Sequence, residues 1–154
     1  MKKSPDKTYG LRTKAVHAGE LPDPNTGASA PNLVMSTTYL ADPEANFSVE
    51  GLQADAPFFY TRWGNPTVRQ LEQKLCALEG AEAAVAFGSG MAAISALFFA
   101  LLRSGDHLVI SDVTYAATAE LTNDLLPGLG IRITKVDMSD LDAVAAAITP
   151  DTRL

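Results

Sequence analysis

The feature that most constrains this chain is a change of sequence pattern near Asn65. Seven of its nine prolines lie at or before position 66, and no helical or strand period is visible in that part. About sixty irregular residues are too many for a single loop inside a compact domain. We therefore predict that residues 1–65 form an arm that packs on another part of the assembly, such as a second subunit.

After Asn65 the pattern becomes regular. Asn65 and Pro66 are typical of a helix start, and apolar residues at helical spacing lead to Gly80 as a C-terminal stop. The sequence then predicts strand 82–87, helix 91–102, strand 107–111, helix 115–126, strand 131–136 and a helix from a Ser139 cap to Ile148. Strands that alternate with helices predict an α/β fold with a parallel sheet. Residues 150–154 are typical of the approach to another strand, so we expect the domain to continue beyond Leu154.

Composition excludes several classes of protein. The net charge of −6 argues against a nucleic-acid surface. The start of the chain is polar, and the longest apolar run, Met91 to Leu102, is shorter than the roughly 20 residues that span a bilayer, so we expect no membrane partner. The lone Cys76 indicates a reducing compartment, the cytoplasm. His17 and His107 are the two histidines and cannot build a metal cluster, so we expect no metal.

The segment from Phe87 to Ala93 lies between a predicted strand and a predicted helix. Its glycines let a ligand approach the backbone, and the free N–H groups of a helix start favour an anion such as phosphate. A tight turn without a ligand is an alternative. Gly88-x-Gly90-x-x-Ala93 also fits the dinucleotide fingerprint, with Asp112 near the expected acidic position. A dinucleotide fold usually opens with that strand, however, whereas here a long segment precedes it.

Two further segments carry candidate ligand-binding side chains. Arg62 stands between Tyr60 and Trp63, just before a predicted helix, and a guanidinium binds phosphate through two parallel hydrogen bonds. The alternative is a surface arginine that packs on an aromatic ring. Tyr115 follows a strand at the carboxyl edge, where parallel α/β sheets bind ligands, and its ring could stack on a planar cofactor. The alternative is a core tyrosine.

These segments, with three others, follow one another along the chain in an order that carries information. They are Val16-His17-Ala18-Gly19, Ser36-Thr37-Thr38-Tyr39, Tyr60-x-Arg62-x-Gly64-Asn65-Pro66-Thr67, Ser89-Gly90-Met91-Ala92-Ala93, Gly105-Asp106-His107 and Tyr115. From about Thr13 to Leu154 the chain resembles the pyridoxal-phosphate enzymes of Cys/Met metabolism (trans-sulfuration), such as cystathionine γ-synthase, cystathionine γ-lyase and methionine γ-lyase. The resemblance implies a fold-type-I PLP-dependent transferase-like domain. Residues 66–154 would be its first part, and residues 1–65 an inter-subunit arm.

The resemblance also implies how the cofactor, pyridoxal 5′-phosphate, is held. Tyr60 and Arg62 would bind the phosphate of the neighbouring subunit's cofactor. Ser89, Gly90 and Met91 would bind the phosphate of their own subunit, with the backbone N–H groups of the last two as donors. Such sharing implies a homo-oligomer, a homotetramer built as a dimer of active dimers.

The implied reaction is γ- (or β-) elimination or replacement on a sulfur amino acid such as cystathionine, homocysteine or O-acyl-homoserine. Tyr115 would stack on the pyridine ring, and its hydroxyl would act as a catalytic group in proton transfer. Methionine γ-lyases typically carry a cysteine where this chain has Ala117, which argues against that activity.

Three groups that such an enzyme needs are implied beyond Leu154: the lysine that binds the cofactor, the carboxylate for the pyridine nitrogen and the arginine for the substrate carboxylate. We therefore expect the 154-residue chain alone to be inactive. The alternatives from the residues themselves are a nucleotide-binding module that uses the Gly88-x-Gly90-x-x-Ala93 turn, or a structural fragment without activity of its own.

Overall fold

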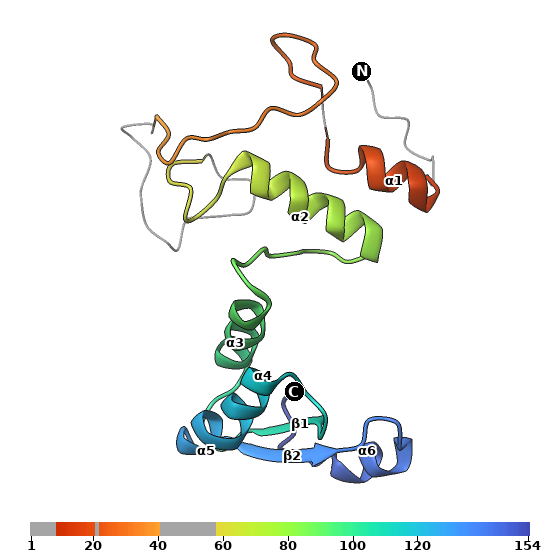
Figure 1. Ribbon diagram of the computed structural model, residues 1–154, viewed down its shortest axis with the longest axis vertical. Coiled ribbons are helices and arrows are strands. Elements are labelled where there is room, and N and C mark those ends of the chain that lie inside the picture. Colours follow the sequence, from red (N-terminus) through yellow and green to blue (C-terminus); the bar gives the residue numbers. More distant parts are fainter. Residues whose placement is uncertain (1–8, 21, 41–57) are drawn as a thin grey trace. The chain divides into compact units, whose positions relative to one another are not determined.

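The computed structural model describes residues 9–20, 22–40 and 58–154. The chain divides into two compact units, Met1–Ala86 and Phe87–Leu154, and Figure 1 labels their helices and strands. The first unit contains α1 (Leu11–His17) and α2 (Pro66–Glu79). The second contains α3 (Gly90–Leu101), β1 (His107–Ser111), α4 (Ala116–Glu120), the π-helical stretch η2 (Leu121–Leu125), α5 (Leu126–Gly128), β2 (Arg132–Val136) and α6 (Leu141–Ala147). Of the expected arm, residues 1–8, 21 and 41–57 lie outside the described residues.

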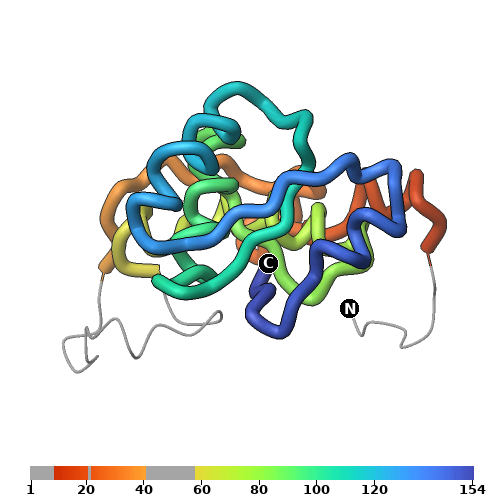
Figure 2. Tube along the Cα trace, turned by 90° about the horizontal axis from the view of Figure 1, so that it is seen from below, coloured from red at the N-terminus to blue at the C-terminus, as the bar shows by residue number. Residues whose placement is uncertain are grey.

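A parallel sheet organises the second unit, as the sequence predicts. β1 and β2 are parallel, with His107 opposite Arg132 and Ser111 opposite Val136. On the other edge of β1, the last residues of the chain also run parallel to it: His107 pairs with Thr152, and the Val109 N–H donates to the Leu154 carbonyl over 3.0 Å. Figure 2 shows this end of the chain beside β1. The expected approach to a further strand at 150–154 is therefore confirmed.

The core of the second unit lies between this sheet and its helices. Its buried apolar side chains are Phe98, Leu102, Leu108, Leu126 and Ile131. His107 is also buried, at 4% exposure. Its ring nitrogens lie 2.8 Å from the Thr152 hydroxyl and 2.7 Å from the Thr134 hydroxyl, so both are within hydrogen-bonding distance of a partner.

In the first unit, the predicted helix from Asn65 to Gly80 is confirmed as α2. The Asn65 side chain caps it by accepting from the Thr67 N–H over 2.8 Å, and Gly80 ends it with a φ of 69° that suits glycine. The helix α1 corrects the expectation that residues 1–65 are irregular, because seven residues are too few to show a helical period.

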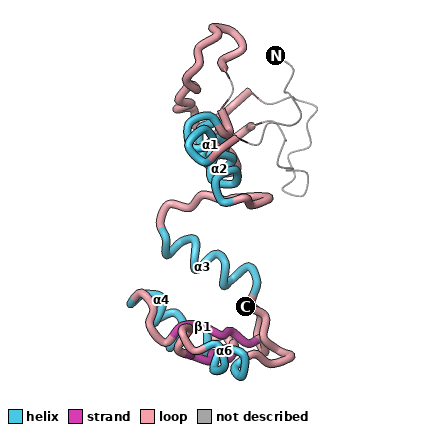
Figure 3. Tube along the Cα trace, turned by 90° about the vertical axis from the view of Figure 1, so that its right-hand side faces the viewer, coloured by secondary structure: helices cyan, strands magenta, loops and turns pink. Residues whose placement is uncertain are grey.

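The helix α1 packs against α2, as Figure 3 shows. The Lys74 ammonium makes an ion pair with Glu20 and donates to the Val16 carbonyl at the end of α1. Gly19 follows with a φ of 73°, and a Cβ there would lie 2.9 Å from the Gln70 carbonyl oxygen. The chain can therefore pass this close to α2 only with glycine at that position.

Asn65 is the one buried side chain among the described residues of the first unit, at 8% exposure. Its Nδ2 lies 3.1 Å from the Val34 carbonyl, 3.1 Å from the Tyr39 hydroxyl and 3.0 Å from the Thr61 hydroxyl. The Thr67 hydroxyl adds to this cluster by accepting from the Val34 N–H over 2.9 Å. Asn65 therefore joins residues 34–39, the turn before α2 and α2 itself.

The predicted strand 82–87 is wrong for this structure. These residues are in an extended loop, and Val85 is 72% exposed. The Ala86 N–H donates to the Glu72 carboxylate on α2 over 2.8 Å, and not to a neighbouring strand. A β-strand forms only where another strand accepts its hydrogen bonds, and no described residue pairs with this segment.

Two predicted helix boundaries also need correction. The helix after Tyr115 begins at Ala116 and passes into the π-helical stretch η2, where the buried Thr122 hydroxyl lies 3.1 Å from the carbonyls of Thr118 and Ala119. The N-cap of α6 is Asp140 and not Ser139. The Ser139 hydroxyl and N–H instead donate to the Asp137 carboxylate, which lowers the pKa of that exposed carboxyl.

Within the described ranges, no helix has both the length and the apolar character needed to cross a membrane.

Replacing Asn65 by alanine is expected to destabilise the full-length protein by about 2 kcal/mol. The lost cap accounts for about 1 kcal/mol, and the Val34 carbonyl left without its donor costs about as much again. Asn65→Ser restores a capping oxygen but is too short to reach Val34, so it should recover only the first part. Urea unfolding followed by circular dichroism measures the change. Asn123→Ala, which removes an exposed bond to Lys135, is the control and should cost less than about 0.5 kcal/mol. Equal effects of both alanine variants would contradict this role of Asn65.

Candidate functional site

The first candidate site is the turn that precedes α2. A short antiparallel pairing holds its start, because the Tyr39 N–H donates to the Phe59 carbonyl over 3.0 Å and the Thr61 N–H donates to the Thr37 carbonyl over 2.8 Å. The Tyr60 carbonyl then accepts from the N–H groups of Trp63 and Gly64. The backbone on both sides of Arg62 is therefore fixed by hydrogen bonds.

Arg62 lies between two aromatic rings in this turn. Its Cζ is 4.6 Å from the centre of the Tyr60 ring and 4.8 Å from the centre of the Trp63 ring. Those two rings are nearly perpendicular, at 80° with centres 6.2 Å apart. Within the part of the chain that the structure describes, the Arg62 side chain makes no ion pair and donates no hydrogen bond. It is exposed, so its N–H donors are available to an anion.

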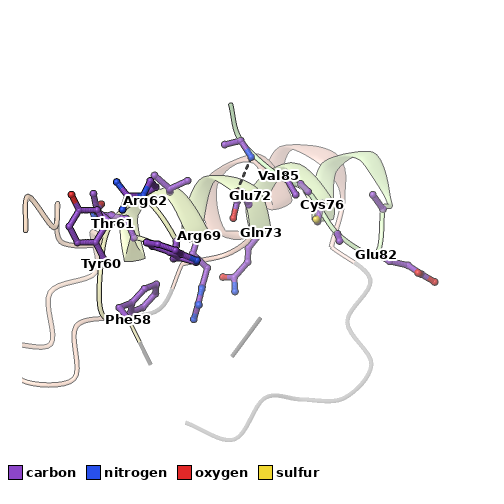
Figure 4. A pocket seen from close by; sticks show the side chains of 18 of the residues that line it. Phe58, Tyr60, Thr61, Arg62, Arg69, Glu72, Gln73, Cys76, Glu82 and Val85 are labelled. Atoms are coloured by element: carbon purple, nitrogen blue, oxygen red, sulfur yellow. Dashed lines mark hydrogen bonds between the residues drawn. The ribbon is translucent and has the colours of Figure 1, made fainter. Parts of the chain in front are cut away.

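A hollow of about 870 Å³ opens beside this turn. It is lined by the turn, by one side of α2 and by residues 81–86, and Figure 4 shows the side chains that face it. Arg69 on α2 is a second arginine at this hollow, with its Cζ 4.1 Å from the centre of the Phe58 ring. The rings of Phe58, Tyr60 and Trp63 form an aromatic wall along this hollow. Arg62 stacks on the last two of these rings and Arg69 on the first.

The second candidate site is the start of α3, in the other unit. The Ser89 hydroxyl accepts from the Ala92 N–H over 3.1 Å, and the Ser89 carbonyl accepts from the Ala93 N–H over 3.1 Å. The N–H groups of Gly90 and Met91 bond to no described residue. A Cβ built on Gly90 would meet no atom within 4 Å, so the space beside these donors is open. A phosphate fits this helix start, because unpaired N–H groups and the helix dipole both favour an anion.

Tyr115 is the N-cap residue of α4, three residues before Thr118. The Thr118 hydroxyl on α4 is 3.5 Å from the sulfur of Met91, which brings the first turns of α3 and α4 together. The Tyr115 side chain is 69% exposed, which excludes the alternative of a core tyrosine in this structure. Its hydroxyl bonds to no described residue. Because Tyr115 follows β1, it lies at the carboxyl edge of the parallel strands, as predicted.

The structure therefore groups the predicted site residues in two sets. In the second unit, Ser89, Gly90 and Met91 lie at the start of α3 and Tyr115 at the start of α4, and the contact of Thr118 with Met91 joins these two helices. Tyr60 and Arg62 lie together in the turn of the first unit.

Two contacts at these sites extend the predictions from sequence. Sequence reasoning noted Trp63 only as an aromatic neighbour, whereas the structure places its ring against the guanidinium of Arg62. It did not identify the contact of Thr118 with Met91 at all. The spacing of three residues between Tyr60 and Trp63, which a tight turn brings together, could have signalled the first contact. Nothing in the local pattern signals the second.

Two of the described lysines are held by structural contacts. Lys74 pairs with Glu20, and the Lys135 ammonium donates to the Asn123 side-chain oxygen over 2.6 Å. Among the described residues, no group of three or more His, Cys, Asp or Glu side chains could hold a metal ion.

Comparison with known proteins identifies the family. The profile described as "Cys/Met metabolism PLP-dependent enzyme" matches residues 12–154. Canavanine γ-lyase from Pseudomonas canavaninivorans is 44% identical over 97% of this chain and 38% of its own length. Cystathionine γ-synthase from Mycobacterium tuberculosis is 45% identical over 94% of this chain and 36% of its own length. The chain thus spans little more than a third of these relatives.

Solved structures agree with the sequence matches. The crystal structure of metB from Corynebacterium glutamicum matches with a TM-score of 0.79 and 39% identity, over 94% of this chain and 36% of that one. Cystathionine γ-lyase from Lactobacillus plantarum, complexed with L-serine, matches with a TM-score of 0.77 and 33% identity, over 94% of this chain and 35% of that one. These matches confirm the resemblance and the predicted fold class, part of a fold-type-I domain. The chain belongs to the Cys/Met metabolism family of enzymes that depend on pyridoxal 5′-phosphate.

Proposed function

We propose that this chain supplies the phosphate-binding part of an enzyme that performs γ- (or β-) elimination or replacement on a sulfur amino acid, such as cystathionine, homocysteine or O-acyl-homoserine. The observation that carries the proposal is the open start of α3. There the N–H groups of Gly90 and Met91 are unpaired, and Tyr115 stands exposed at the adjoining helix start. The relatives named for γ-lyase and γ-synthase activities support the reaction class.

Pyridoxal 5′-phosphate, when bound, supplies an electron sink for the charge left when the Cα proton of an amino acid is removed. The Gly90 and Met91 N–H groups, with Ser89, would hold its phosphate. A phosphate carries about −1.5 to −2 charges at neutral pH, so it gains from the helix dipole as well as from hydrogen bonds. Nothing in the first turn of α3 opposes this charge, because that turn has no acidic side chain.

Tyr60 and Arg62 would bind the phosphate in the neighbouring subunit. This arrangement gives residues 1–65 a role as an inter-subunit arm, with residues 66–154 as the first part of the cofactor domain. It makes the active protein an oligomer, a dimer of active dimers. The lone Cys76 fits an enzyme of the cytoplasm.

Tyr115 would have two roles in the reaction. Its exposed ring would stack on the planar cofactor, and its hydroxyl, which bonds to no described residue, would hold or transfer a proton near the substrate. Ala116 and Ala117 follow it and place two methyl groups in the first turn of α4.

Replacing Arg62 by alanine in the full-length protein is expected to weaken cofactor binding by about 1.5–3 kcal/mol, the usual contribution of a hydrogen bond to a charged group. Titration of the apoenzyme with pyridoxal 5′-phosphate, followed by absorbance, measures the change. Arg69→Ala removes a neighbouring arginine stacked on Phe58 and should leave the affinity unchanged. If Arg62→Ala also binds the cofactor normally, Arg62 does not belong to the site.

The loss caused by Arg62→Ala should be repaired across subunits. An inactive Arg62→Ala protein is mixed with an inactive variant in the cofactor-binding lysine of the full-length protein, and the subunits are allowed to exchange. One site of each mixed dimer then has both residues intact, so about half of the wild-type activity per mixed dimer should return. Subunit exchange is verified separately by native mass spectrometry. Exchange without recovered activity would place Arg62 in its own subunit's site or away from any site.

Substitution of Tyr115 should separate the role of its ring from that of its hydroxyl. Tyr115→Phe keeps the ring, so cofactor affinity should stay while turnover falls about 10²–10⁴-fold. Tyr115→Ala should lower cofactor affinity as well, by about 1 kcal/mol. Release of 2-oxo acid from cystathionine, homocysteine and methionine measures turnover, and methionine should be the poorest substrate because Ala117 has no thiol. Normal turnover of Tyr115→Phe on the best substrate would show that the hydroxyl has no catalytic role.

A further inference from the structure

We propose that Trp63 is a positioning residue: its indole ring holds the Arg62 guanidinium in the orientation that binds the cofactor phosphate. This inference rests on the proposed role of Arg62 as a phosphate ligand. It concerns what keeps that arginine in place before the phosphate arrives.

The geometry around Arg62 leaves the task to the aromatic rings. Within the described chain, Arg62 has no carboxylate partner and donates no hydrogen bond, so no polar group fixes its long side chain. The contacts that it does make are the rings of Tyr60 and Trp63, at 4.6 and 4.8 Å from its Cζ. Both distances are within the roughly 6 Å over which a cation is attracted to an aromatic face.

The two rings are not equivalent. Tyr60 is itself a proposed phosphate ligand through its hydroxyl. Trp63 has no such role, and indole is the aromatic group that attracts a cation most strongly. Arg62 is itself exposed although its Cζ lies 4.8 Å from the Trp63 ring centre, so the guanidinium stays accessible to an anion while it contacts the ring.

Trp63 is itself held firmly enough to act as a support. Its backbone N–H donates to the Tyr60 carbonyl over 3.0 Å. Its ring centre lies 5.3 Å from that of Phe59 and meets the Tyr60 ring edge to face. An arginine loses much rotamer freedom when it is fixed on a ligand, and a ring that restricts it beforehand reduces this loss. Trp63 therefore acts on affinity for the phosphate and not on the chemistry of the pyridine ring.

The test compares two probes, pyridoxal 5′-phosphate and pyridoxal, which differ only in the phosphate. Apoenzyme of the full-length protein carrying Trp63→Leu is titrated with each. The Kd for pyridoxal 5′-phosphate should rise about two- to twelvefold, the range expected when one long side chain must be ordered on binding, and the Kd for pyridoxal should change less than twofold. Trp63→Phe retains a ring and should fall between the wild type and Trp63→Leu.

A double-mutant cycle shows whether Trp63 acts through Arg62. In an Arg62→Ala background, Trp63→Leu should have no further effect on the Kd for pyridoxal 5′-phosphate. An equal loss in both backgrounds would overturn the positioning role. If Arg62→Ala weakens cofactor binding but Trp63→Leu does not, this inference fails and the proposed role of Arg62 stands. If Arg62→Ala alone has no effect, the proposed role of Arg62 fails first.

Phe58→Leu is the matched control, because it removes the ring beneath Arg69 in the same aromatic wall. It should leave the Kd for both probes unchanged. Thermal unfolding of each apoenzyme variant shows whether the turn is still folded. A loss of affinity for both probes in Trp63→Leu would mean a general disturbance of the site and would contradict the inference.

Discussion

The Asn65 side chain is the buried amide on which the first unit depends. The described part of the first unit has no fully buried apolar side chain, so the hydrophobic effect fixes its parts less strongly than it does in the second unit. Asn65 instead uses the directionality of hydrogen bonds: its oxygen starts α2, and its nitrogen binds Val34, Tyr39 and Thr61. The Arg62 turn lies within this frame, with Arg62 three residues before the Asn65 cap. The residue that caps the helix therefore also sets where the arginine is presented.

The two candidate phosphate ligands use different physics. The start of α3 offers backbone donors whose direction is fixed by the helix, so it needs no further ordering when an anion binds. Arg62 offers a full charge on a long side chain, which is stronger but must be ordered. The aromatic rings around Arg62 provide that order. A phosphate held by both, as proposed, would combine a rigid, weaker set of donors with a strong donor that needs support.

Much of the fold follows from local signals in the sequence. The cap at Asn65, the stop at Gly80 and the strand His107–Ser111 each depend on a few adjacent residues, and the structure shows them where they were predicted. The strand expected at 82–87 depended on a neighbour that the sequence cannot show, and it is absent. The π-helical stretch depends on the Thr122 hydroxyl bonding back to the preceding turn, a competition that helical periodicity does not reveal.

The candidate sites were predictable to the same extent. The helix start at Ser89 follows from the glycine-rich turn before α3, and the position of Tyr115 follows from the junction of β1 with α4, and both signals are local. The stacking of Trp63 on Arg62 and the contact of Thr118 with Met91 depend on how a turn closes and how two helices meet. Such contacts appear only once the chain is folded.

The buried His107 has a consequence for how faithfully the strands assemble. Its two ring nitrogens need partners on the segments to either side of β1, and Thr134 and Thr152 provide them. Side chains along a strand alternate between faces, so a slip of one residue in either neighbour would turn its threonine away. The imidazole would then be left buried with an unmet hydrogen bond, at a cost of about 1–3 kcal/mol. A slip would also move the apolar side chains of that strand to the other face, so His107 adds a directional hydrogen-bond penalty to the loss of apolar burial and helps to fix the register of the sheet.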